Sequence, residues 1–110
     1  KKIAKMAEII WAPSAIKDIE AIADYIAKDS VWAAQNMVSL FFEKAKILER
    51  HPLIGKPVPE TRLSYLKELL VSRYRIIYEV ISEEEVHILS VHHQSRLLKN
   101  NPTFKKRLRK

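Results

Sequence analysis

Three short β segments joined by two tight turns constrain this chain more than any other feature. The segments are predicted over Leu66–Val71, Tyr74–Ile81 and Val86–His93, where β-branched and aromatic residues are frequent. Ser72-Arg73 and residues 82–85 are the predicted turns. Because parallel strands need a long crossover, turns this short predict that neighbouring segments pair antiparallel.

The two faces of the middle segment differ in character. One face carries the aromatic and aliphatic side chains of Tyr74, Ile76, Tyr78 and Val80. The opposite face, together with the preceding turn, carries the mixed set Arg73, Arg75, Ile77 and Glu79. Alternation along a strand therefore predicts a core-facing side and a partly open side that carries Arg75.

Two helices are predicted before these strands. Apolar residues recur at spacings of three and four from Ala15 to Ile26, and again from Ala34 to about Arg50. Asp29-Ser30 interrupts the pattern and can cap the second helix. A break this short predicts an antiparallel helical hairpin.

The remaining segments complete the expected fold. Residues 6–12 are apolar and partly β-branched, which predicts a first strand ended by Pro13. Residues 51–65 hold three of the five prolines and the only glycine, which predicts a loop. The fold class is therefore α+β, in the order β-α-α-β-β-β. We expect the helical hairpin to pack on one face of a mostly antiparallel four-stranded sheet.

The positive charge of the chain is concentrated at its C-terminal end. Residues 1–85 hold 13 Lys/Arg and 13 Asp/Glu, whereas residues 86–110 hold seven Lys/Arg and no acid, which accounts for the formal charge of +7. We expect one domain over residues 1–96 and a basic tail over 97–110. The basic side chains of the tail could contact nucleic-acid phosphates or an acidic protein, or could form an ordinary charged terminus; they include Lys105, Lys106, Arg107 and Arg109.

Composition excludes several classes of function. The chain has no cysteine, so it has no disulfide framework and no thiolate metal site. One glycine cannot build a phosphate-binding or dinucleotide-binding loop, and adjacent His92 and His93 are poor metal ligands without nearby carboxylates. We expect no metal and no cofactor. No apolar run approaches the roughly 18 residues needed to cross a bilayer, and we expect the protein to act in the cytoplasm.

A group of basic side chains is the main candidate for chemistry. The last two strands are neighbours, so five side chains can converge: Arg73, Arg75, His92, His93 and Arg96. Cleavage of RNA by its 2′-OH needs a base, an acid and cations, which His and Arg supply. The alternative is a solvated positive face, or pairing of Arg73 and Arg75 with Glu68 or Glu79. On a strand, His92 and His93 cannot point the same way.

The aromatic residues are predicted to be mostly core. They are Trp11, Tyr25, Trp32, Tyr65, Tyr74 and Tyr78. Trp32 lies in the first turn of the second predicted helix, where packing against the core is expected. A partner surface is the alternative for Trp32.

Several motifs in this order resemble a known family. They are IKDIEAIADYIAKDS, VWAAQ, HPLIGKPV, YRIIYEV and VHILSVHHQSR. Over about residues 6–96 the chain resembles the RelE/ParE superfamily of toxins from bacterial type II toxin–antitoxin systems, and most of all its ParE, or plasmid-stabilisation, branch. The resemblance implies the β-α-α-β-β-β fold and an antitoxin whose extended segment wraps the toxin.

The resemblance implies two different targets. RelE-like members are similar to RNases that cut mRNA in the ribosome, whereas ParE-like members poison DNA gyrase without a known catalytic site. Arg75 matches the arginine of the corresponding RelE strand. Lys67 beside Glu68 does not match the RelE lysines cleanly. Gln94 and Asn100 stand where a RelE arginine and tyrosine would be.

The resulting hypothesis is a ParE-like inhibitor of DNA gyrase, neutralised by a cognate antitoxin of the ribbon-helix-helix type with an acidic toxin-binding segment. The docking surface would comprise Lys67, Arg73, Arg75, Arg96 and the basic tail. One alternative is a ribosome-dependent mRNA endoribonuclease that uses Arg75, His92 or His93, and Arg96. A second alternative is a non-toxic binding module.

Overall fold

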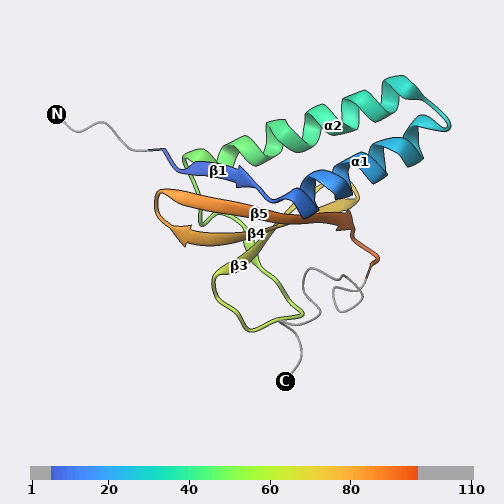
Figure 1. Cartoon of the computed structure of the whole chain (residues 1–110). Coiled ribbons are helices and arrows are strands. Elements are labelled where there is room, and N and C mark those ends of the chain that lie inside the picture. The colour runs from blue at the N-terminus through green and yellow to red at the C-terminus, as the bar shows by residue number, and fades with distance from the viewer. Residues whose placement is uncertain (1–5, 97–110) are drawn as a thin grey trace.

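Two helices lie on one face of a mixed five-stranded sheet (Figure 1). The computed structural model describes residues 6–96, so the predicted tail with Lys105, Lys106, Arg107 and Arg109 lies outside the described residues. The helical elements are α1 Pro13–Ala27, α2 Val31–Ala45 and the 3-10 helix η1 Lys46–Glu49. The strands are β1 Glu8–Trp11, β2 Lys56–Pro57, β3 Leu66–Val71, β4 Tyr74–Ser82 and β5 Glu85–His93.

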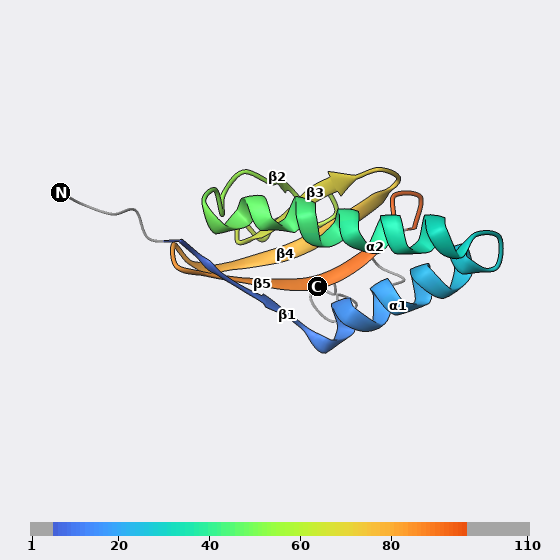
Figure 2. The ribbon, with the colours of Figure 1, turned by 90° about the horizontal axis from the view of Figure 1, so that it is seen from above.

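The predicted helical hairpin is confirmed. α1 and α2 pack side by side and run in opposite directions across the sheet (Figure 2). Pro13 opens α1, and the Ser30 hydroxyl caps α2 by accepting a hydrogen bond from the Ala33 N–H at 3.0 Å. α2 ends at Ala45, before the predicted end near Arg50, because the chain tightens there into η1.

The sheet confirms the predicted class and adds one strand. Its order is β1-β5-β4-β3-β2, with β3, β4 and β5 antiparallel and β1 parallel to β5. The prediction of four strands was wrong, because β2 pairs with β3 inside the segment predicted as loop. Two residues give no periodic signal, and Pro57 is compatible with pairing because β2 is an edge strand.

Side chains of α1 continue the edge of β5 where β1 ends. The Ser14 hydroxyl donates to the Leu89 carbonyl at 2.7 Å, and the Asp18 carboxylate accepts from the Val91 N–H at 2.9 Å. Residues four apart on a helix are separated by about 6 Å along its axis, close to the roughly 6.7 Å between residues two apart on a strand. This match lets one helix face satisfy an otherwise open strand edge.

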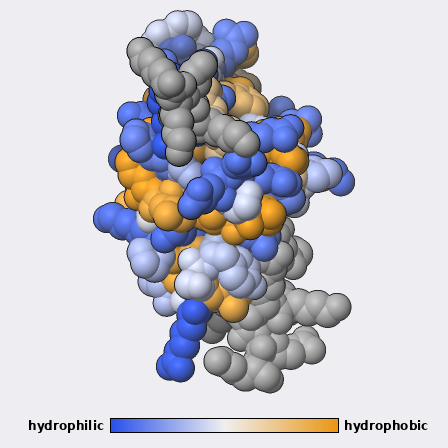
Figure 3. All heavy atoms as spheres, turned by 90° about the vertical axis from the view of Figure 1, so that its left-hand side faces the viewer, coloured by the Kyte–Doolittle hydropathy of each residue, from blue (hydrophilic) through white to orange (hydrophobic). Residues whose placement is uncertain are grey.

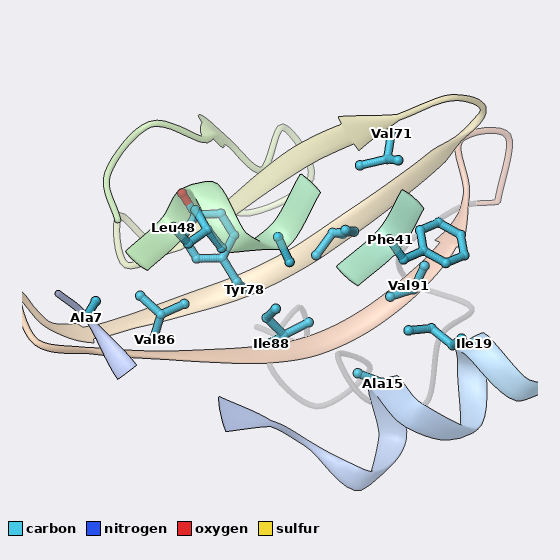
Figure 4. Packing of buried hydrophobic residues seen from close by; sticks show 12 residues of the cluster. Ala7, Ala15, Ile19, Phe41, Leu48, Val71, Tyr78, Val86, Ile88 and Val91 are labelled. Atoms are coloured by element: carbon cyan, nitrogen blue, oxygen red, sulfur yellow. The ribbon is translucent and has the colours of Figure 1, made fainter. Parts of the chain in front are cut away.

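The main core lies between the sheet and the helices, as predicted for the Tyr74, Ile76, Tyr78 and Val80 face of β4. Figure 4 shows Phe41 and Leu48 from the helical side pointing toward the strands. The Tyr78 hydroxyl accepts a hydrogen bond from the Gly55 N–H at 2.9 Å. A Cβ on Gly55 would lie 2.5 Å from that hydroxyl oxygen, so only glycine fits at this position of the loop.

The opposite face of the sheet is not open as predicted. The segment between β2 and β3 lies on the side of the sheet away from the helices (Figure 1). Its Val58 packs with Leu66 and Ile77 in a second buried cluster. As a result Arg75, expected on an open face, is 5% exposed. Burial of this face depends on how the proline-rich segment crosses the sheet, which strand periodicity does not reveal.

Three of the predicted core aromatics are exposed instead. Tyr25 is 70%, Trp32 is 74% and Tyr65 is 40% exposed. Tyr25 and Trp32 flank the turn between α1 and α2, which projects beyond the sheet in Figure 1, so no second layer covers them. The prediction that Trp32 packs in the core was therefore wrong, and its alternative as part of a surface is favoured.

Candidate functional site

Arg75 and His92 are direct partners across β4 and β5. They share the sheet face away from the helices, and His92 is only 3% exposed. The next pair, Tyr74 and His93, falls on the other side, with ring centroids 5.6 Å apart. The prediction that His92 and His93 point in different directions is thus confirmed, and only His92 lies beside Arg75.

The guanidinium of Arg75 is held by two carboxylates. Nη1 and Nη2 each donate to one oxygen of Glu60 at 2.7 Å, and Nε donates to Glu68 at 2.7 Å. The hydrogen bond to Glu60 raises the pKa of Arg75, as does Glu68, while burial acts in the opposite direction. Pairing with Glu68 was one of the alternatives read from the sequence. Glu60 was missed.

His92 is neutral at neutral pH. Its Nδ1 lies 3.3 Å from the hydroxyl oxygen of Ser90, which itself donates to Asp18 at 3.0 Å. Burial and, to a smaller extent, the positive charges of Arg75 and Arg96 together lower the pKa of His92 to about 4, although Glu60 acts in the opposite direction. This imidazole therefore adds no positive charge to the face at neutral pH.

The other predicted basic residues are divided between two faces. Arg73 occupies the turn between β3 and β4, where its carbonyl accepts from the Gln94 N–H at 2.8 Å, and Arg96 follows the end of β5. Both are exposed and lie at the same end of the sheet as Arg75. Lys67 pairs with Tyr78 and so belongs to the helix-facing side. The structure thus brings Arg73 and Arg96 near Arg75 and separates Lys67 from them.

An open hollow of about 340 Å³ lies beside the guanidinium. It is lined by Pro59, Glu60, Glu68, Leu70, Arg75 and Gln94. Two acids and one arginine give this lining a formal charge of −1. A phosphate entering the hollow would meet an arginine whose charge is already compensated, so the arrangement resembles a structural ion cluster more than an oxyanion clamp.

A second hollow lies at the opposite end of β4, near the turn into β5. It measures about 530 Å³ and is lined by the last residue of η1, the loop over residues 50–54, Val80 and Glu83. Hydrophobic side chains are exposed among hydrophilic ones on this end of the molecule (Figure 3). Leu53 and Ile54 are the most exposed of them in the loop, at 63% and 50%.

Within residues 6–96, no three His, Cys, Asp or Glu side chains are grouped so that they could hold a metal ion. In the same part of the chain, neither helix is long and apolar enough to cross a membrane.

The fold is shared with chains from bacterial toxin–antitoxin systems. The structure is similar to a chain of the chromosomal ParDE toxin–antitoxin system from P. aeruginosa, with a TM-score of 0.68 and 22% identity over 82% of this chain and 98% of that one. It is also similar to a chain of the toxin–antitoxin complex RelBE2 from Mycobacterium tuberculosis, with a TM-score of 0.59 and 23% identity over 86% and 98% of the two chains.

Sequence comparison gives the family. The model described as ParE toxin of type II toxin-antitoxin system, parDE, matches residues 9–98, so the chain belongs to the ParE toxin family. It is a toxin component of a type II toxin–antitoxin system. Toxin RelE2 from Caulobacter vibrioides is 34% identical over 92 residues, which cover 84% of this chain and all of that protein. The matches carry both ParE and RelE names, so they do not distinguish a gyrase target from a ribosome target.

Proposed function

We propose that this toxin stops growth by binding DNA gyrase and does not cut mRNA. The proposal rests on the hydrogen bonding of Arg75. Its Nη1, Nη2 and Nε all donate to Glu60 or Glu68, so its charge is already compensated. Membership of the ParE toxin family supports the same target, because ParE-like members of the superfamily poison DNA gyrase.

The chemistry of RNA cleavage fits this face poorly. Transfer of the 2′-OH proton needs an accessible base, and the developing phosphorane charge needs cations that are not already neutralised. Here His92 is 3% exposed and Arg75 is paired with two carboxylates. A phosphodiester would have to displace Glu60 and also reach a buried imidazole.

We further propose that a cognate antitoxin neutralises the toxin in the cytoplasm. The solved structures with this fold include a ParDE system and a RelBE2 complex, in which toxins are paired with antitoxins. The antitoxin would be of the ribbon-helix-helix type and would present an acidic segment to the exposed Arg73 and Arg96. The exposed aromatic side chains of Tyr25 and Trp32 provide a second contact region.

A supercoiling assay tests the gyrase target. Purified toxin is added to gyrase, ATP and relaxed plasmid, with toxin pre-mixed with its antitoxin as the control. We expect supercoiling to fall and linear plasmid to accumulate after detergent and protease treatment, and antitoxin to prevent both effects. Full supercoiling at a large excess of toxin, with ribosome-dependent mRNA cutting by the same preparation, would refute the proposal.

The endoribonuclease remains the second candidate because Arg75 and His92 are adjacent across β4 and β5. The name of the 34% identical relative, Toxin RelE2, favours the same alternative. If this candidate is correct, His92→Gln should abolish mRNA cutting in translating ribosomes while leaving the circular dichroism spectrum unchanged. Toxicity that survives His92→Gln would instead support the gyrase target.

A further inference from the structure

We propose that Arg75 is a carboxylate-exchange site, in which an Asp or Glu side chain of a partner protein replaces Glu60 on Nη1 and Nη2. The inference rests on the proposed antitoxin only for the source of the incoming carboxylate. The site itself is defined by Arg75, Glu60, Glu68 and the adjoining hollow.

The two glutamates that hold Arg75 are not equivalent. Glu68 belongs to β3, its side chain is 8% exposed, and its Oε1 accepts from Nε at 2.7 Å and lies 2.5 Å from Nη2. Glu60 belongs to the segment between β2 and β3, its side chain is 29% exposed, and it binds Nη1 and Nη2. Glu68 therefore orients the guanidinium from a paired strand, while Glu60 occupies its outer edge from a loop.

The outer edge of the guanidinium must always be occupied by an anion. The Arg75 side chain is 7% exposed, and without Glu60 its Nη1 would lose its acceptor and the buried charge would be balanced by Glu68 alone, which is destabilising. Departure of Glu60 is thus tolerable only if another group brings two oxygens in the same plane. Glu60 already shows this bidentate geometry, with both distances at 2.7 Å.

The surroundings favour a protein carboxylate over a nucleic-acid phosphate. The hollow beside Arg75 includes Pro59 and Leu70, and Leu70 is 49% exposed, which suits an apolar peptide neighbour. Exposed Arg73 and Arg96 at the same end favour the approach of an acidic segment.

The test measures binding of a fluorescein-labelled hexaglutamate peptide by fluorescence anisotropy to native protein and to Glu60→Gln. Glutamine keeps the size of the side chain and removes the competing charge. If Glu60 occupies Arg75 for more than nine-tenths of the time, its removal should tighten peptide binding at least about tenfold. The double variant Glu60→Gln/Arg75→Gln is the matched control and should lose this gain.

Thermal unfolding first establishes that each variant is folded. If Glu60→Gln does not fold, the native protein is titrated with the peptide, and the Arg75 guanidinium and Glu60 carboxyl NMR resonances should shift together. No gain in the folded variant, or no such shift in the native protein, overturns the proposal. A gain for a labelled RNA hexamer without one for hexaglutamate also overturns it. The binding assay contains no gyrase, so its outcome is separate from that of the supercoiling assay.

Discussion

His92 links the stability of the toxin to pH. The pKa of this imidazole is about 4 in the folded protein and about 6.5 in an unfolded chain. The unfolded state therefore takes up a proton first as the pH falls, and the free energy of unfolding decreases between about pH 6.5 and pH 4. The two pKa values predict a loss of about 2 kcal/mol between pH 7 and pH 5 from this group alone.

The perturbation that isolates His92 is His92→Gln, which cannot titrate. Urea unfolding of both proteins, followed by circular dichroism at pH 7, 6 and 5, separates its contribution from that of the carboxylates. The native protein should lose about 2 kcal/mol more than the variant over this range. Parallel pH dependences in the two proteins would show that burial and the nearby arginines do not depress the pKa, and would refute the description of this face as closed.

Three further substitutions and two exposed-site controls test the packing, each followed by urea unfolding. Gly55→Ala should cost about 1–3 kcal/mol, because the new Cβ would meet the Tyr78 hydroxyl at 2.5 Å, and an unchanged midpoint would contradict this close approach. Asp18→Ala should cost about 1–3 kcal/mol by leaving the Val91 N–H without its acceptor, whereas the exposed neighbour substitution Lys17→Ala should be near neutral. Phe41→Ala should cost about 3–5 kcal/mol, and Trp32→Ala should stay within about 0.5 kcal/mol. A large loss for Trp32→Ala would contradict its exposure.

Local patterns in the sequence were sufficient to predict most of the fold. The helical period, the cap at Ser30 and the two tight turns each act over a few residues, and together they predict the hairpin and the β3-β4-β5 order. The parallel pairing of β1 with β5 and the short strand β2 depend on tertiary placement, which those patterns do not encode.

The candidate site was only partly predictable. Strand alternation predicts that His92 and His93 point in different directions, but the pairing register was needed to show that His92 shares the face of Arg75 and that Lys67 does not. The role of Glu60 could not be read from the sequence, because it depends on a long loop that crosses the sheet and brings residue 60 to residue 75. The exposure of Trp32 was missed for a related reason, since a helical period does not show where a helix extends beyond its sheet.

If the toxin acts on gyrase as proposed, the sheet face that carries Arg75 and His92 is not a catalytic centre. The most direct measurement maps mRNA 5′ ends by primer extension in a translating system given native toxin or His92→Gln, at equal and saturating concentrations. For both proteins we expect the same 5′ ends as in the reaction without toxin. New 5′ ends produced by native toxin and absent with folded His92→Gln would contradict it.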